Sequence, residues 1–214
     1  MTLAGAPVPL RTELGPGERE REVDVEEHGP DHALRIASRR KRYKQPVEYG
    51  ILLIRLVVGL AFAGHGAQKL FGWFGGGGPQ GTAGFFASLG YRAPAAMAIL
   101  AGLSELAGGL LLASGLLTPL AALLLATVML NAIATVQWRK GFLGGWELDT
   151  TFMAVGLAVT MTGPGRLSLD HAIGWADDIT GPAWASLAFA AAIVASLLTT
   201  TLGRARADLD EIPG

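Results

Sequence analysis

Four polar side chains stand inside one long apolar stretch, residues 49–74, and they are the first candidates for chemistry. They are Arg55, His65, Gln68 and Lys69. The apolar part of this stretch reaches the length of about 20 residues with which a helix crosses a bilayer. A charged side chain near the middle of such a span costs roughly 2.5–3.5 kcal/mol on insertion scales, so it normally faces protein or water. We therefore expect these polar groups to avoid lipid.

The charged residues of this stretch share one face of the expected helix. Successive residues turn by about 100° around a helix axis, which brings residues three and four positions apart onto one face. The resulting stripe consists of Arg55, Gly59, Phe62, Gly66 and Lys69, with His65 at its edge. Because the other faces are apolar, we expect this stripe to face protein or a water-filled cavity.

Glu105 is the most informative acid, because it lies near the middle of a second apolar stretch, residues 95–114. Its neighbours one helical turn away are all small; they are Ala101, Gly102, Gly108 and Gly109. Small residues let another helix approach closely. At about 1.5 Å per residue, Arg55 and His65 lie some 7–8 Å to either side of the centre of the first span. We therefore expect both to converge on Glu105.

Each of these three residues has a chemical and a structural interpretation. His65 could transfer a proton or donate a hydrogen bond to a quinone carbonyl, since histidine titrates near neutral pH. The alternative is a structural histidine bonded to a backbone carbonyl or to Glu105. Glu105 is either a proton relay or one half of a buried ion pair that fixes helix register. Arg55 either binds an anion or, as we favour, is the counter-ion of Glu105.

His65, Gln68 and Lys69 are the candidate contacts to a quinone headgroup, because they lie within about one helical turn of each other. For Lys69 we favour a simpler role. It lies near the outer end of the span, where a lysine can extend its ammonium group to the interface.

The composition indicates a membrane protein with a charged tail. Half of the 214 residues are hydrophobic and only 16% are charged. Residues 1–48 contain 9 of the 17 Lys and Arg and 9 of the 18 Asp and Glu. The net charge of −1 gives no reason to expect a nucleic-acid partner. The chain has no cysteine, which excludes a thiol nucleophile and Cys-ligated metals. A redox role would therefore need a bound cofactor or a partner protein.

Residues 1–48 form a charged tail without the apolar run of a cleavable signal peptide. We expect disorder in the first part of this tail and a short helix over residues 31–44. That helix ends in a basic cluster, residues 39–44. Basic residues just before a first span hold the amino terminus in the cytoplasm.

The fold class that follows is an all-α integral membrane protein with five spans. We expect them at residues 49–71, 95–114, 120–138, 148–162 and 184–202. The first four would form a four-helix bundle, and the fifth would be an additional helix near the carboxyl end. Five crossings would place the carboxyl terminus outside.

The remaining polar residues have structural explanations. Asn131, in the third span, is expected to hydrogen-bond to another helix. Glu147 stands at a helix start, where the helix dipole stabilises a carboxylate. His28, His32 and His171 have no partner at metal-ligand spacing, so we expect no metal site.

Several motifs together resemble the DoxX family of small bacterial and archaeal membrane proteins. The resemblance runs over about residues 50–175, and its motifs occupy residues 64–72, 81–90, 105–109, 115–119, 138–142 and 162–170. They read GHGAQKLFG, GTAGFFASLG, ELAGG, GLLTP, WRKGF and TGPGRLSLD. Gln137 departs from the pattern, since members often have histidine before this tryptophan. The departure argues against a site that needs two membrane histidines.

The resemblance implies a four-helix membrane domain in a bacterial plasma membrane and a link to redox physiology. An archaeal relative is associated with thiosulfate:quinone oxidoreduction, and actinobacterial relatives with a membrane oxidoreductase complex that resists oxidative and thiol stress. The domains expected here are a cytoplasmic tail (1–48), the DoxX-like domain (49–175), and an extra helix with a short tail (176–214).

For function, the sequence supports a membrane subunit of an oxidoreductase system and does not support a stand-alone enzyme. Arg55, His65 and Glu105 would form a buried polar site that accepts a quinone or relays a proton, while partner proteins supply electrons. The alternatives are a scaffold or assembly subunit without chemistry, and a transporter of small solutes or protons.

Overall fold

The computed structural model describes the backbone of residues 30–204 and the side chains of residues 47–204. Most of the tail in which we expect disorder lies outside the described residues. Contacts divide the chain into two units, Met1–Pro46 and Val47–Gly214. In the first unit the backbone is helical from Pro30 onward, which includes the helix expected over residues 31–44. The second unit is a helical bundle that contains all the candidate residues.

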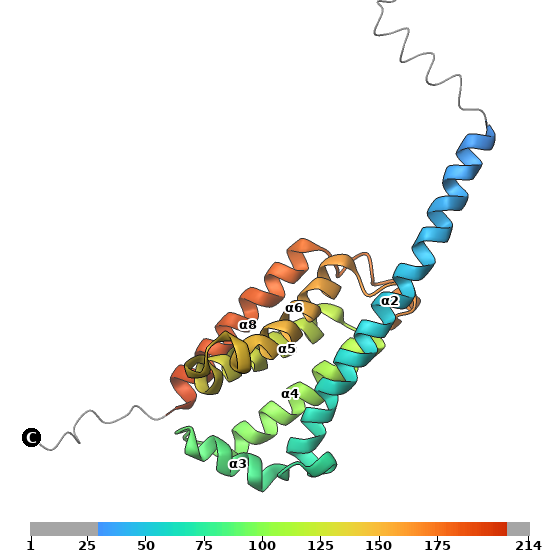
Figure 1. The fold of residues 1–214 in the computed structure, drawn as a ribbon. Coiled ribbons are helices and arrows are strands. Elements are labelled where there is room, and N and C mark those ends of the chain that lie inside the picture. Colours follow the sequence, from blue (N-terminus) through green and yellow to red (C-terminus); the bar gives the residue numbers. More distant parts are fainter. Residues whose placement is uncertain (1–29, 205–214) are drawn as a thin grey trace, which may run out of the picture. The chain divides into compact units, whose positions relative to one another are not determined.

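Five long helices dominate the described part of the chain (Figure 1). They are α2 (Pro30–Phe71), α4 (Pro94–Ser114), α5 (Thr118–Ala132), α6 (Glu147–Thr162) and α8 (Pro182–Gly203). Two shorter helices, α3 (Gly78–Ser88) and α7 (Leu169–Ala172), lie in the connections. Beyond its α-helical part, α5 continues through the π-helical turn Ile133–Gln137 and the 3₁₀ turn Trp138–Lys140. The fold is therefore all-α, as expected.

Four of the described helical segments are long and apolar enough to cross a membrane. They are Val47–Phe71, Pro94–Ser114, Thr118–Lys140 and Pro182–Gly203. The helix expected to be the fourth span, α6, has 16 residues and a length of about 24 Å. It is thus shorter than the others, although it packs within the same bundle.

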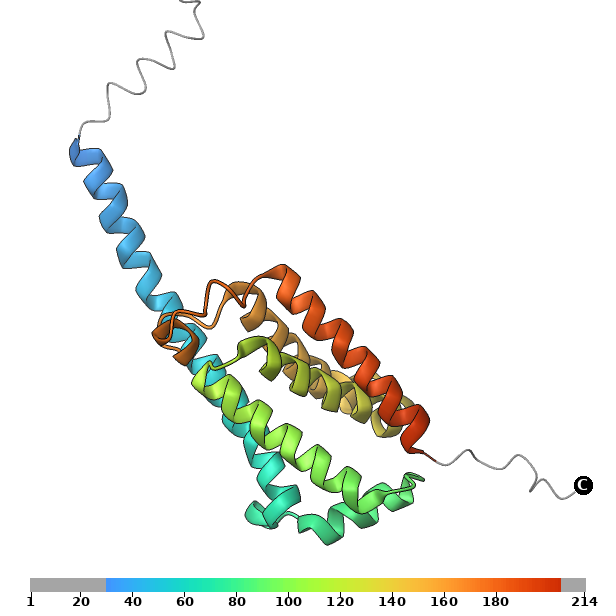
Figure 2. The ribbon, with the colours of Figure 1, turned by 180° about the vertical axis from the view of Figure 1, so that it is seen from behind.

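Helix α5 lies at the centre of the bundle (Figure 2). It packs against α4, α6 and α8, while α6 also packs against α8 and α3 packs against α4. The buried core joins Phe62 of α2, Leu112 of α4 and Leu125 of α5. Phe62 belongs to the stripe expected to face protein, and Arg55, Gly59 and Gly66 of that stripe are buried as well. The prediction that this stripe faces protein is confirmed.

Helices α2 and α4 touch backbone to backbone through glycines. A Cβ added to Gly59 would lie 2.6 Å from the carbonyl oxygen of Gly109, and one added to Gly66 would lie 2.7 Å from that of Gly102. Nothing larger than hydrogen fits at these positions. Because Gly59 opposes Gly109 and Gly66 opposes Gly102, the two helices run antiparallel in a fixed register. The small-residue face of the second span therefore makes the close contact expected from the sequence.

We expect Gly66→Ala to destabilise the protein while Gly64→Ala, two residues away, does not. A Cβ at Gly66 would lie 2.4 Å from the backbone nitrogen of Leu106, whereas one at Gly64 would meet nothing within 4 Å. Overpacking of this kind costs about 1–3 kcal/mol. At Gly64, alanine should be neutral or stabilising, because it is the better helix former.

Thermal unfolding of the two variants in the same detergent, followed by tryptophan fluorescence, measures the difference. Equal melting temperatures for the two variants would contradict the close packing of α2 and α4.

Candidate functional site

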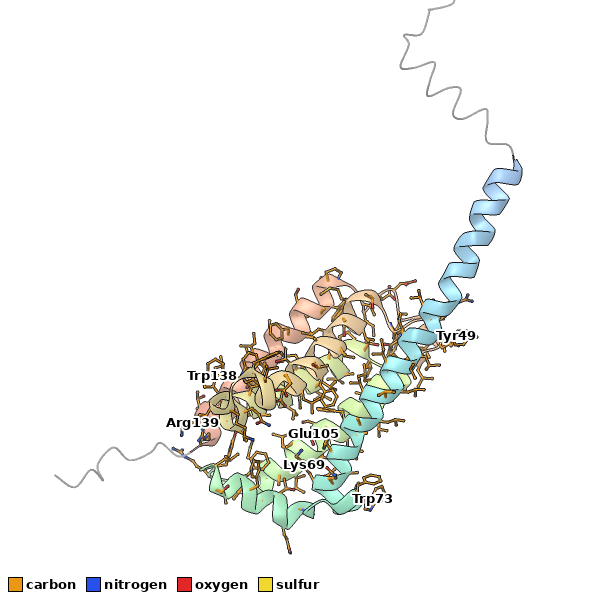
Figure 3. The ribbon with its side chains drawn as sticks, viewed as in Figure 1. Tyr49, Lys69, Trp73, Glu105, Trp138 and Arg139 are labelled. Atoms are coloured by element: carbon orange, nitrogen blue, oxygen red, sulfur yellow. The ribbon has the colours of Figure 1, made fainter. Side chains whose placement is uncertain are left out.

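The charged centre of the bundle is an ion pair between Lys69 of α2 and Glu105 of α4. The Lys69 ammonium donates to both carboxylate oxygens, at 2.6 Å to Oε1 and 2.5 Å to Oε2. The Glu105 side chain is 4% exposed and the Lys69 side chain 29%. Figure 3 shows the two side chains close together between their helices. A buried carboxylate needs such a partner, because removing it from water without one costs several kcal/mol.

The ion pair lies in the wall of a cavity of about 390 Å³. The cavity is bounded by α2, α3, α4, α5 and α8, and most of its lining is apolar. Its apolar lining includes Phe85, Phe86, Leu100, Leu124 and Val128. A mostly apolar cavity with a few convergent polar groups is the usual form of a small-molecule site. The Lys69–Glu105 pair supplies the charged groups of this cavity.

A second set of polar residues lines the cavity from α5 and α8. Thr127, Asn131 and Thr135 follow one another at four-residue spacing along α5 and so share one face. The Asn131 amide donates to the Thr127 carbonyl at 2.9 Å and accepts from the Thr199 hydroxyl of α8 at 2.9 Å. Asn131 thus joins two helices, as expected from the sequence.

Gln137, where the chain departs from the family pattern, also lines the cavity. Its Oε1 atom is buried without a hydrogen-bond partner. A buried carbonyl oxygen left unpaired costs about 1–3 kcal/mol, and none of the described residues donates to this one.

Tyr91 lines the cavity from the turn between α3 and α4. Burial raises the pKa of its phenol, against the opposing effect of Arg204. The phenol therefore stays protonated at neutral pH and keeps its ability to donate a hydrogen bond.

Arg55 does not contact Glu105, so the expected convergence of Arg55 on that carboxylate is wrong. Its guanidinium instead donates to four backbone carbonyls, those of Leu112, Ala113, Pro164 and Leu167. Arg55 is 1% exposed. The five N–H donors of arginine suit it to such a cluster of acceptors. Arg55 therefore clamps the 163–168 loop onto the end of α4.

Asp170, the last residue of the motif at residues 162–170, completes this clamp. Its side chain is fully buried and accepts from the backbone N–H groups of Leu117 and Thr118 at 2.8 and 3.0 Å. The Thr118 hydroxyl donates to it at 2.6 Å. Asp170 thus caps the start of α5, whose first N–H groups have no partner within the helix. The start of α5 has no side-chain cap of its own, and this was the signal that another segment of the chain must supply an acceptor.

His65 and Gln68 lie outside the cavity lining, so of the three expected quinone contacts only Lys69 reaches it. The His65 ring shares a hydrogen bond with the Gln68 side chain, Nδ1 to Oε1, at 3.1 Å. His65 is exposed on the surface of the bundle. Within the described part of the chain, no direct bond joins His65 to Glu105.

Among the described residues, no group of three or more His, Asp or Glu side chains is placed to hold a metal ion. His28 and the side chain of His32 lie outside the described residues.

Apolar helices of spanning length that enclose a charged, partly hollow site define an integral membrane protein with an internal cavity. A family model described as DoxX matches residues 50–138. The chain is 35% identical over 123 residues to a protein of Bacillus subtilis (strain 168) named "Putative oxidoreductase CatD", covering 58% of this chain and 86% of that relative. The chain belongs to the DoxX family. No solved structure matches it.

The family match covers most of the residues that line the cavity, but not those of α8. It includes Lys69, Glu105, Asn131 and Gln137 but ends before α6. The wider domain boundary at residue 175 stays a prediction.

We expect Arg55→Lys to destabilise the bundle by at least about 2 kcal/mol. Lysine keeps the positive charge but cannot reach four divergent carbonyls, and each buried carbonyl left unpaired costs about 1–3 kcal/mol. Arg166→Lys is the matched control, because the Arg166 side chain is exposed in the same loop.

Melting temperatures of the two variants in detergent test this expectation. An Arg55→Lys variant as stable as Arg166→Lys would mean that charge alone, and not the bonds to the loop, is what Arg55 contributes.

Proposed function

We propose that this DoxX protein is the membrane subunit of an oxidoreductase system and that its cavity receives a quinone headgroup beside Lys69 and Glu105. The observation that carries the proposal is the buried ion pair in the wall of a mostly apolar cavity of about 390 Å³. The name of the Bacillus subtilis relative, "Putative oxidoreductase CatD", supports the redox class.

The chemistry of the ion pair suits a quinone. An ammonium group has three N–H donors, and Glu105 occupies two of those of Lys69. The third is left for a carbonyl oxygen of the ligand. The apolar walls suit a ring and an alkyl chain that arrive from the bilayer.

Glu105 would then handle protons. Reduction of a quinone to a quinol takes up two electrons and two protons. We assign the electrons to a redox partner protein, because the chain has no cysteine to carry them. In the ion pair the proton is on Lys69, which can donate it to a ring oxygen, while the Glu105 carboxylate can accept the replacement protons, which come from water outside the bilayer.

For the orientation, we propose a bacterial plasma membrane with the amino terminus in the cytoplasm. The basic cluster at residues 39–44, just before the first span, supports this orientation through the positive-inside rule. The Lys69 end of α2 would then lie toward the outer face.

Bound quinone tests the proposal directly. Wild type, Glu105→Gln and Lys69→Met are purified from native membranes in mild detergent, and quinone is extracted with solvent and quantified by mass spectrometry. We expect the amount of bound quinone to fall at least about tenfold in both variants, because a hydrogen bond to a charged group contributes about 1.5–3 kcal/mol.

Two control variants change residues that lie outside the cavity lining. Lys140→Met removes an exposed lysine outside the cavity, and His65→Ala removes the histidine that does not line it. Both should retain quinone at the wild-type level. Trace quinone at the same level in all five folded proteins would eliminate the quinone site and leave a scaffold role ahead.

A further inference from the structure

Besides Tyr91 and Gln137, the polar groups of the cavity come from two separate walls. Lys69, Glu105 and Ser104 belong to α2 and α4, whereas Asn131 and Thr199 belong to α5 and α8. Apolar side chains make up most of the lining between them. A ligand with a single polar head, such as a fatty acid, would use only one of these walls.

Hydrogen bonds to two helices hold the Asn131 side chain in place, as is usual for a group that binds a ligand. Its amide is fixed by the bond to the Thr127 carbonyl within α5 and by the bond from the Thr199 hydroxyl of α8. These bonds use one of its two N–H donors and one of the lone pairs on its carbonyl oxygen. The amide thus keeps one donor and one acceptor, and its orientation is set before any ligand arrives.

A polar side chain inside a membrane span usually has a structural or functional role, because its insertion into the bilayer costs free energy. The link from Asn131 to α8 needs only one of the two ends of the amide. Thr127 and Thr135 satisfy their own hydroxyls on the α5 backbone, at 2.8 and 2.7 Å, and so give no link to another helix. Helix packing alone does not account for a polar stripe on the cavity side of α5.

We propose that Asn131 makes the second hydrogen bond to the ligand, so that the cavity selects a ring with two oxygen atoms over a ring with one. One oxygen lies at the Lys69–Glu105 pair and the other at Asn131. Because the Asn131 amide offers a donor and an acceptor, it serves a carbonyl and a hydroxyl alike. Asn131 is thus a specificity-determining residue for both redox forms of the ligand. This inference rests on the proposed quinone site.

A pair of ligands that differ in one oxygen atom tests it. A hydroquinone and a phenol with the same alkyl chain are titrated under anaerobic conditions into detergent-purified protein, and dissociation constants are measured by calorimetry. We expect wild type to bind the hydroquinone about fivefold to tenfold more tightly, which is the value of one net hydrogen bond. In Asn131→Leu the ratio should fall to about one, with the affinity for the phenol unchanged.

The controls separate a ligand contact from a structural role. Retained phenol binding shows that Asn131→Leu has folded, and Asn131→Ser is the milder variant if it has not. Thr201→Val, an exposed threonine of α8 that bonds only to its own helix, should keep the wild-type ratio. A purely structural Asn131 would weaken both ligands equally.

Two outcomes overturn the inference in different ways. If wild type binds both ligands with equal affinity, or if Asn131→Leu keeps the preference for the hydroquinone, Asn131 is not the second contact and the proposed quinone site survives. If neither ligand binds to wild type, the proposed site fails and this inference fails with it.

Discussion

The close approach of α2 and α4 determines where the polar groups of the cavity can lie. Gly59 and Gly66 meet Gly109 and Gly102 with no side chain between the backbones. A shift of one residue would push a Cβ into a space that holds only hydrogen, so the two helices cannot slide past one another. Lys69 and Glu105 stand on these same helices. The glycine contacts therefore set the helix register, and the Lys69–Glu105 ion pair follows from that register.

The direction of side chains explains why Glu105 pairs with Lys69 and not with Arg55. On a helix, each side chain leans toward the amino-terminal end of its own helix. In the antiparallel pair, Glu105 leans toward Gly102 and Lys69 leans back toward Gly66, which opposes Gly102. Arg55 leans away from Glu105. The prediction from the sequence compared only the depths of the Cα atoms in the membrane and ignored the direction of the side chains. It therefore paired Arg55 with Glu105 incorrectly.

Local patterns in the sequence were sufficient to predict the long helices, the buried stripe of α2 and the small-residue face of α4. These features depend on residues three, four and seven positions apart, which a single helix brings together. The partners of Arg55 and of the α5 start come from residues 164–170, about 110 and 50 positions away. No periodicity relates such distant segments. The cavity could not be predicted either, because it depends on how far α4 and α5 diverge.

The two ends of the α4–α5 pair differ in what holds them. At the end near Gly115, the Arg55 and Asp170 side chains bind backbone groups of α4 and of the α5 start, and a Cβ on Gly115 would meet the Arg55 guanidinium at 2.7 Å. Toward the other end the helices diverge (Figure 2), and side chains line the cavity between them. Hydrogen bonds to the backbone hold the helices in place whichever side chains occupy other positions. Side chains that line the cavity, in contrast, can change without moving the helices. Gln137, the residue at which this chain departs from the family pattern, stands at that open end. The side chains that line the cavity can therefore vary within one bundle while the clamped end preserves its register.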